Sequence, residues 1–563
     1  MDAIMVCVVG LCILLVCQVV DAIPKVQPYR TAYHFQPPQN WMNGPMYYKG
    51  VYHLFYQYNP CGPVWGNITW AHSVSYDLIN WVHIDHALYP VDFYDSEGCF
   101  SGSTTFLLKN KPVILYTGVV TRQLYETQNL AMPKNLSDPF LRDWVKYSHN
   151  PLMTPVDGIY PEFYRDPSTA WQGPDKIWRV LVGSIDSDGH GMAILYRSKN
   201  FIDWKMAEKP LHSSNKTKIW ECPDFYPVST KSKVGLDTST FGKSTKHVLK
   251  ISLILHHDDH YILGTYNPKT EEFKVESDFM DRRLDLRYDY GKFYASKTFF
   301  DSAKKRRILW GWIEEFDNEQ DAIKRGWAGL QAIPRSIVLG KTGKHLVQWP
   351  VEEVNKLRAK KVSLANKELK SGVLIEVPGI TASQFDIEVS FDAMNLKEAE
   401  LLDPRWTDPQ LLCSQKAAAV GGKVGPFGLL VLASKDLSEK TAVFFRIFRR
   451  SHDNYAVLMC NDASKSTLRE RVNKPTYGAF VDLDPQHEKI SLRTLVDHSI
   501  VETFGGEGRT CITTRIYPKL AIFNQAHLYA FNNGTQSVRM SELNAWSMKK
   551  PSLFLLRVEK RHP

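Results

Sequence analysis

The sequence has little cysteine for its length. Nine cysteines occur in 563 residues, and three of them lie within the first twenty positions. The remaining six are Cys61, Cys99, Cys222, Cys413, Cys460 and Cys511. Six cysteines cannot form a disulfide framework for so long a chain, so the packing of buried side chains must stabilise the fold.

Long hydrophobic runs are also scarce. The one such run, from Ile4 to Val20, is short for a membrane span and is followed by the small-residue cleavage pattern Val20-Asp21-Ala22. We therefore interpret residues 1–22 as a signal peptide. Because Asp2 is present and Lys and Arg are absent before the run, an uncleaved anchor is the alternative. After cleavage we expect a secreted protein of the extracellular space, apoplast or cell wall, without membrane contact.

Four N-x-Ser/Thr acceptor sites agree with secretion. Taken together with the signal peptide, they predict glycosylation at Asn67, Asn135, Asn215 and Asn533.

Positive charge is present but not concentrated. The formal net charge of +9 is spread along the chain, with small clusters at Lys304–Arg307 and Arg557–His562. No basic tract is interleaved with aromatic residues and no nucleic-acid motif occurs, which excludes a nucleic-acid partner. For a secreted cationic protein, an anionic cell-wall polysaccharide is the partner that the charge suggests.

A short phrase recurs at intervals of about sixty residues. It reads SYDLINW at Ser75–Trp81, SDPFLRDW at Ser137–Trp144 and SKNFIDW at Ser198–Trp204, with the tryptophans 63 and 60 residues apart. Each phrase joins segments rich in β-forming residues, such as Val113–Thr117. This period predicts a β-propeller with four-stranded blades, and residues 28–350 have room for about five. We assign the repeated tryptophans a packing role.

The repeat does not continue beyond this region. Residues 351–370 are charged and compatible with a helix, so we predict a linker there. Short alternating strands such as Ala442–Phe448 follow, which predicts a β-sandwich over residues 371–563. The predicted fold is therefore all-β, a five-bladed β-propeller followed by a C-terminal β-sandwich. We expect a disulfide between Cys413 and Cys460, both in the sandwich region, and a free Cys222.

Three acidic motifs carry a family resemblance. The segments are Gln39–Tyr48 (QNWMNGPMYY), Tyr164–Pro167 (YRDP) and Trp220–Phe225 (WECPDF). They resemble W-M-N-D-P-N-G-P, F-R-D-P and W-E-C-P-D-F of glycoside hydrolase family 32, which includes plant cell-wall acid invertases and fructan exohydrolases. YRDP alone is a weak signal, whereas WECPDF is specific. The likeness continues through Leu286–Gly291, Trp310–Trp312 and Asp497–Glu502, so it covers the mature chain.

The resemblance implies a retaining hydrolase of fructosyl bonds that uses neither metal nor cofactor. It implies that Glu221 is the general acid/base and that Asp166 binds substrate hydroxyls and stabilises the transition state. Phe100 stands where the family usually has tryptophan. The implied substrate-binding residues are Trp41, Asn43, Gln57, Trp65, Phe100, Ser101 and Arg165.

One departure from the family concerns the nucleophile. Asn43 is followed directly by Gly44, so the Asp-Pro-Asn of the family motif, including the nucleophilic aspartate, is missing. A retaining enzyme needs a carboxylate about 5 Å from its acid/base, and an asparagine amide cannot form the ester intermediate. The gap fits an omitted short exon, in transcript or gene model. Two hypotheses follow: a β-fructosidase whose written form lacks activity, or a catalytically silent carbohydrate-binding or regulatory homologue.

The gap also affects strand register. Side chains alternate along a strand, so a three-residue deletion would reverse their facing unless a loop absorbs it. We expect the loop to absorb it, because hydrophobic pairing anchors Tyr52–Gln57.

A second departure concerns the substrate. Cell-wall invertases often carry S-L-D-x-x-K, whose Asp and Lys bind the glucosyl unit of sucrose. Here Ile254 takes the Asp position and His257 the Lys position, as in fructan exohydrolases, although Asp258 and Asp259 lie near enough to serve as a shifted substitute. Pro223 is the residue of the cell-wall subgroup. We favour fructan over sucrose as the substrate.

Overall fold

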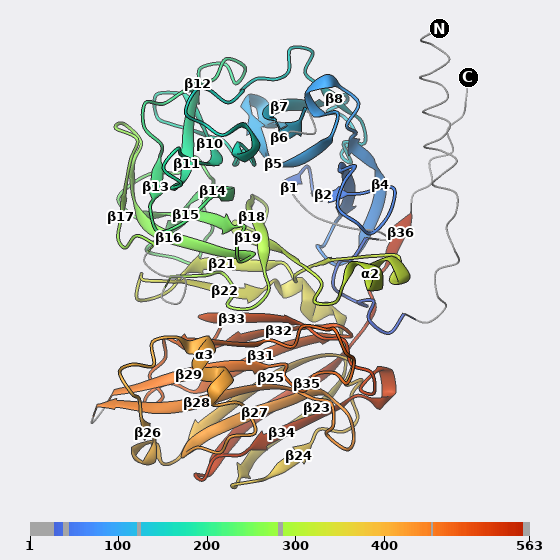
Figure 1. The fold of residues 1–563 in the computed structure, drawn as a ribbon, viewed down its shortest axis with the longest axis vertical. Coiled ribbons are helices and arrows are strands. Elements are labelled where there is room, and N and C mark those ends of the chain that lie inside the picture. Colours follow the sequence, from blue (N-terminus) through green and yellow to red (C-terminus); the bar gives the residue numbers. More distant parts are fainter. Residues whose placement is uncertain (1–26, 38–43, 121–124, 280–284, 452–453, 556–563) are drawn as a thin grey trace.

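The structure is a computed structural model that describes residues 27–37, 44–120, 125–279, 285–451 and 454–555 (Figure 1). The predicted signal peptide and the predicted site residues Trp41 and Asn43 lie outside these ranges. Among the described residues, no helix has the length and apolar character needed to cross a membrane.

Five antiparallel sheets make up the N-terminal part of the fold. The first runs β1 (Pro45–Tyr48), β2 (Val51–Tyr58), β3 (Thr69–Ser75), β4 (Trp81–Leu88). The second runs β5 (Gly98–Leu107), β6 (Lys111–Val119), β7 (Glu126–Pro133), β8 (Trp144–Lys146). The third runs β9 (Trp171–Gln172), β10 (Trp178–Ile185), β11 (Gly191–Ser198), β12 (Lys205–Met206), with β13 (His212–Ser214) also pairing with β11.

The fourth sheet runs β14 (Trp220–Ser229), β15 (Thr245–Leu253), β16 (Asp258–Asn267), β17 (Glu272–Val275). The fifth contains β18 (Tyr294–Asp301), β19 (Arg306–Ile313), β21 (Arg335–Leu339) and β22 (Leu346–Pro350), with β20 (Leu330–Gln331) also pairing with β19. In Figure 1 these sheets form the upper body, coloured from blue to yellow. They are the five blades of the predicted β-propeller.

The repeated phrase forms the turn between the third and fourth strands of a blade. In the first copy, Asp77 Oδ1 accepts hydrogen bonds from the backbone N–H groups of Ile79 and Asn80. The indole of Trp81 donates to the carbonyl of Leu78, which has a positive φ of 63°. In the other two copies Asp138 and Asn200 likewise accept from backbone N–H groups, and the Trp204 indole donates to the Phe201 carbonyl, whereas the Trp144 indole makes no such bond. The phrase therefore has the structural role that its period predicts.

Strand β2 keeps the register that its hydrophobic pattern requires. Tyr52 to Gln57 are all buried and pair with β3 from Tyr52↔Ser75 to Gln57↔Trp70. Strand β1 starts at Pro45, immediately after Gly44, and pairs with β2 through Pro45↔Leu54. The expected anchoring of Tyr52–Gln57 is therefore confirmed, whatever conformation the preceding motif adopts.

Two sheets form the β-sandwich. One runs β23 (Arg358–Leu369), β35 (Val538–Met548), β25 (Gln384–Ala393), β31 (Ile490–Asp497), β32 (Ile500–Gly505), β33 (Thr510–Arg515). The other runs β24 (Leu374–Glu376), β34 (His527–Asn532), β27 (Val424–Ala433), β28 (Thr441–Ser451), β29 (Asn454–Asp462), β30 (Thr476–Val481), with β26 (Glu400–Leu401) pairing with β28. Their facing side chains, Phe385, Ile387, Phe427 and Phe445 among them, form a core that is fully buried. The all-β fold class is confirmed.

Two of the predicted boundaries differ from the structure. Residues 351–370 are not a helical linker, because the short 3-10 helix η4 (Glu352–Leu357) leads directly into β23, which pairs with β35 along most of its length. Val362 and Leu364 of β23 pack on the sandwich core, which explains the strand. At the other end, β36 (Leu553–Leu555) leaves the sandwich and pairs in parallel with β4 of the first blade.

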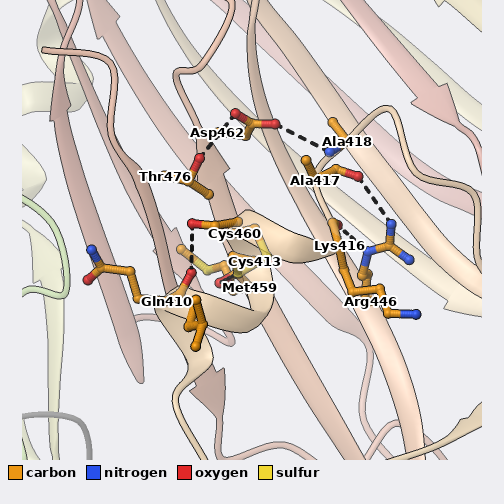
Figure 2. Close-up of a disulfide and its surroundings, with 12 residues drawn as sticks. Gln410, Cys413, Lys416, Ala417, Ala418, Arg446, Met459, Cys460, Asp462 and Thr476 are labelled. Atoms are coloured by element: carbon orange, nitrogen blue, oxygen red, sulfur yellow. Dashed lines mark hydrogen bonds between the residues drawn. A yellow bond between two sulfur atoms is a disulfide. The ribbon is translucent and has the colours of Figure 1, made fainter. Parts of the chain in front are cut away.

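The disulfide expected between Cys413 and Cys460 is present (Figure 2). It joins α3 (Pro409–Gln415), whose N-terminus is capped by the Asp408 side chain, to the C-terminal part of β29. Both cysteines are buried in an apolar cluster with Leu412 and Phe444. Cys222 is not disulfide-bonded, as predicted.

Candidate active site

One pocket collects every predicted catalytic and substrate-binding residue that the structure describes. All five blades contribute to it, mostly through residues near the ends of strands or in the adjoining loops. The lining residues are Gln57, Trp65, Phe100, Ser101, Arg165, Asp166, Glu221, Cys222, Tyr294, Ala295 and Trp312. Residues that are far apart in the sequence therefore meet where the blades converge.

Glu221 lies at the start of β14, next to an irregularity in the pairing of β14 with β15. Its Oε1 accepts a hydrogen bond of 2.9 Å from Arg165 Nη1, and its Oε2 accepts one from the Tyr294 hydroxyl. Burial raises the pKa of this carboxyl, Arg165 opposes the rise, and the charge of Asp166 adds to it. A carboxylic acid that keeps its proton above the usual range suits a general acid.

Asp166 is held in an unusual backbone conformation. Its φ is 64°, a left-handed value that is uncommon for a residue with a side chain, and it is buried. Its N–H donates to Thr117 Oγ1 over 2.8 Å. Its Oδ2 accepts from the Cys222 N–H over 2.9 Å and from the Cys222 thiol over 3.4 Å. Backbone strain maintained by such contacts is typical of functional sites.

The thiol of Cys222 serves this carboxylate as a donor. Burial, followed by the neighbouring charge of Asp166, raises the pKa of the Cys222 thiol well above its usual value. The thiol therefore stays protonated and orients Asp166.

Arg165 is oriented by Glu126, a residue that sequence reasoning missed. Glu126 Oε2 accepts from the Tyr164 N–H over 2.9 Å and from Arg165 Nε over 3.0 Å, and Oε1 lies 2.6 Å from Arg165 Nη2. Glu126 is completely buried, and burial raises its pKa to about 8. The guanidinium thus joins two buried carboxyl groups, Glu126 behind the pocket and Glu221 inside it.

The aromatic wall of the pocket has a buried and an exposed side. Trp65 is 57% exposed, and its ring lies 5.6 Å from that of Phe100 in an edge-on arrangement. The Trp70 indole donates to the Phe100 carbonyl and fixes this strand, while Gln57 Nε2 donates to Ser101 Oγ over 3.0 Å. These groups offer apolar faces and hydroxyl or amide partners, a combination that suits a polyhydroxylated ligand.

The predicted substrate-discriminating pair lies beside the pocket. Ile254 and His257 are in the turn between β15 and β16. The His257 ring stacks on Tyr294 with centroids 4.8 Å apart, and its Nδ1 is 2.5 Å from Glu314 Oε1. Tyr294 in turn donates to Glu221, so His257 is separated from the proposed acid/base by a single side chain.

Asp258 and Asp259 do not substitute for the missing acidic residue. Both are buried at 1% exposure or less, and neither lines the pocket. Asp259 accepts from Ser252 Oγ and the Ser296 N–H and pairs with the buried Lys250 at 3.2 Å. Asp258 pairs with His260 and Arg287, so both carboxylates are held by contacts inside the protein.

The predicted glycosylation sites differ in exposure. Asn67, Asn135 and Asn215 are exposed, which a modified asparagine requires. Asn533 is half-buried, and its side-chain nitrogen donates to the carbonyl of Ala418 over 3.1 Å. Glycosylation would have to break this contact, so we expect it at the three exposed positions.

A buried acid with a raised pKa, a second carboxylate and an aromatic rim, placed at the meeting point of five blades, define a glycosidase. The chain belongs to glycoside hydrolase family 32. Residues 34–350 match "Glycosyl hydrolases family 32 N-terminal domain", and residues 353–547 match "Glycosyl hydrolases family 32 C terminal".

Several relatives of known activity are similar over nearly the whole chain. An insoluble β-fructofuranosidase isoenzyme of Arabidopsis thaliana is 54% identical, covering 94% of this chain and 92% of the relative. Fructan 6-exohydrolase of Beta vulgaris is 52% identical, covering 94% and 88%. The crystal structure of fructan 1-exohydrolase IIa from Cichorium intybus superimposes with a TM-score of 0.92 at 54% identity, covering 94% and 99%.

Proposed function

We propose that the protein is a secreted β-fructosidase that releases terminal fructosyl units from fructans or from sucrose. Glu221 protonates the oxygen of the leaving group and later accepts a proton from water. Asp166 binds fructosyl hydroxyls and stabilises the transition state. The observation that carries the proposal is the convergence of Glu221, Asp166 and Arg165 in one pocket with their predicted aromatic and polar neighbours.

The sequence does not contain the nucleophile that the reaction requires. In a retaining mechanism, a carboxylate attacks the anomeric carbon as the glycosidic bond breaks and forms a fructosyl ester. Among the described residues that line the pocket, the carboxyl groups are Asp166 and Glu221. Asp166 Oδ2 is committed to the N–H and thiol of Cys222. The full reaction therefore needs the aspartate that is missing between Asn43 and Gly44.

The second candidate function is that of a catalytically silent carbohydrate-binding or regulatory homologue. The direct junction of Asn43 and Gly44 favours it, because the binding groups of the pocket remain while the nucleophile is absent. Fructose release by the chain as written, compared with a version carrying Asp-Pro-Asn between these residues, separates the two functions. A transcript that encodes the three residues would reject the silent function for the native product.

Fructan is the substrate that we favour over sucrose. Ile254 offers no acceptor for glucosyl hydroxyls, His257 is occupied by Glu314, and Asp258 and Asp259 are buried. The similar solved structures include fructan 1-exohydrolase IIa of Cichorium intybus in complex with 1-kestose. Relative turnover of 1-kestose and sucrose tests the preference.

Retention in the cell wall follows from charge. The net charge of +9 favours an anionic wall polysaccharide, and relatives carry the names insoluble isoenzyme and cell wall isozyme. Release of the protein from isolated walls by salt would support this partner, and retention at 1 M salt, where charges are screened beyond about 3 Å, would contradict it.

A further inference from the structure

The Asp497–Glu502 segment of the sandwich forms hydrogen bonds with the N-terminal segment of the propeller. Asp497 ends β31, and its two carboxylate oxygens accept from the N–H groups of Ala32, Tyr33 and His34 over 2.7, 2.7 and 2.8 Å. The His34 ring adds a fourth contact, with Nδ1 2.9 Å from Asp497 Oδ2. A single buried carboxylate thus captures three consecutive backbone donors, which fixes this stretch of chain.

Glu502, in the middle of β32, binds the fifth blade. Its Oε1 accepts from the Ile333 N–H over 2.7 Å and lies 3.3 Å from His34 Nε2. Its Oε2 accepts from Arg335 Nη2 over 2.8 Å. The side chains of His34, Arg335 and Glu502 are fully buried. The His34 ring therefore lies between two carboxylates of the sandwich and connects the contacts of Asp497 with those of Glu502.

The N-terminal segment bound by Asp497 and the part of the fifth blade bound by Glu502 contact each other, and further contacts lead from them to the pocket. The Gln331 N–H donates to the Phe35 carbonyl over 3.0 Å, which joins the N-terminal segment to β20. Gln331 pairs with Trp312 of β19, and Trp312 lines the pocket. The Trp312 ring lies 6.2 Å from that of Tyr294, the donor to Glu221. A continuous path of short contacts leads from the sandwich to the pocket wall.

The charged groups of this interface depend on one another. Arg335 contacts both Glu502 and Asp289, and Asp289 in turn accepts from the Thr513 N–H over 2.8 Å. Removing one member of a buried ion cluster leaves its partner uncompensated, which is far costlier than exchanging the whole cluster for apolar groups. The arrangement therefore specifies one geometry between sandwich and propeller.

We propose that Asp497 and Glu502 are positioning residues of the active site, which hold the Trp312 wall in place through His34, Phe35 and Gln331. The sandwich would then be required for ligand binding, although none of the sandwich residues that the structure describes lines the pocket. This inference rests on the proposed function, since it takes the pocket as the fructosyl-binding site. It also gives a role to the Asp497–Glu502 motif, for which the chemistry of hydrolysis has no use.

The test compares two carboxylate neutralisations in the full chain. Asp497→Asn removes the negative charge and one of the two acceptor oxygens that hold residues 32–34. Glu439→Gln makes the same change in an equally buried sandwich carboxylate, which accepts from the N–H groups of Leu468, Lys519, Leu520 and Ala521 and does not contact the propeller segments described above. Both variants lose stability. At a fixed interval below each melting temperature, we expect Asp497→Asn to bind 1-kestose about tenfold more weakly, while Glu439→Gln binds like the parent chain.

Hydrogen exchange provides a readout that does not depend on the substrate. In Asp497→Asn, exchange should accelerate in residues 31–36, in β20 and around Trp312, and remain unchanged in β27 and β28. Should Asp497→Asn fail to fold, His34→Gln provides the same comparison, since it removes the imidazole ring that contacts both Asp497 and Glu502. If folded Asp497→Asn or His34→Gln exchanges hydrogen in β19 and β20 at the same rate as the parent chain, the proposal is overturned.

The two proposals can fail separately. If the parent chain does not bind 1-kestose, the proposed function is wrong, while exchange at β19 and β20 still decides whether the sandwich positions the wall. If the parent binds and both variants bind equally, the positioning role is wrong and the proposed function is unaffected.

Discussion

Arg165 Nη1 lies 2.9 Å from Glu221 Oε1, while the other two nitrogens of the same guanidinium contact the buried Glu126. One cation thus stands between two carboxyl groups whose pKa values are both raised by burial. How much of its charge reaches Glu221 depends on how firmly Glu126 holds it. The acidity of the proposed general acid is therefore set partly by a residue outside the pocket.

Restoring the missing segment should restore hydrolysis. The chain as written should release fructose about 10⁴–10⁶-fold more slowly than a version with Asp-Pro-Asn inserted between Asn43 and Gly44, because loss of a covalent nucleophile typically costs this much. Fructose release from 1-kestose and sucrose measures the difference. An insert carrying Asn-Pro-Asn is the matched control, since it restores length without the carboxylate. Comparable rates in all three would show that Asp166 or another group acts as nucleophile.

Removing Glu126 should make Glu221 more acidic. In Glu126→Leu, Arg165 loses its anchoring contacts and can turn its full charge towards Glu221, which lowers the pKa of that carboxyl. In the chain with Asp-Pro-Asn restored, the alkaline limb of the pH–rate profile should move to lower pH. The variant should also be less stable than the parent, because it removes the buried acceptors of Arg165 Nε and of the Tyr164 N–H. An unmoved limb would show that Glu126 has only a structural role.

Tyr294→Phe should have the opposite effect on the same profile. The Tyr294 hydroxyl donates to Glu221 Oε2 and so lowers the pKa of the carboxyl. Without this donor the pKa should rise, and the alkaline limb should move to higher pH. The ring and its stacking on His257 are retained, so melting temperature should change little. A shift to lower pH would contradict the assigned hydrogen bond.

Substrate preference should respond to the turn between β15 and β16. The double change Ile254→Asp and His257→Lys introduces an acceptor and a donor beside Tyr294, and we expect sucrose turnover to rise relative to 1-kestose. His257→Lys alone serves as the control, since it places an ammonium group beside Glu314 without introducing the new carboxylate. Equal ratios in the parent and the double variant would reject the assignment of this pair.

His34 should make the protein less stable as pH rises. Asp497 and Glu502 outweigh burial and raise the pKa of His34 above its ordinary 6.5, so the folded state binds the proton more tightly than the unfolded chain. The resulting stabilisation is complete below about pH 6.5 and is lost as pH rises through the folded-state pKa. Arg335 and Asp289 face the same cluster, and His498 lies close enough to lower the pKa of Asp497.

Thermal melts of the parent and His34→Gln across this pH range check the sign. The difference in melting temperature between them should shrink with increasing pH. A constant difference would mean that His34 does not change protonation on unfolding.

The amino-acid sequence by itself determined the local chemistry and the class of fold. The spacing of the repeated phrase depends on a turn made by neighbouring residues, so it predicted blades whose turns the hydrogen bonds of Asp77 and Asn200 bear out. The motifs around Asp166 and Glu221 identified residues that the structure brings into one pocket, Glu221 from the start of β14 and Asp166 from the irregular segment before β9.

Only the tertiary structure decided which distant residues surround them. Glu126 and Tyr294 carry no local signal of a site, and each acquires its role from a partner far away along the chain, Arg165 for Glu126 and Glu221 for Tyr294. Trp312 lies in a segment that resembles the family, but only the fold shows that it lines the pocket. The pairing of β36 with β4 and of β23 with β35 was likewise not predicted, since the charged sequence of β23 resembles a linker and the three residues of β36 are too few to show a strand pattern. Desolvation and the placement of charges depend on all the surrounding side chains. The raised pKa of Glu221 and the hydrogen bonds from the N-terminal segment to Asp497 therefore exist only once the chain has folded.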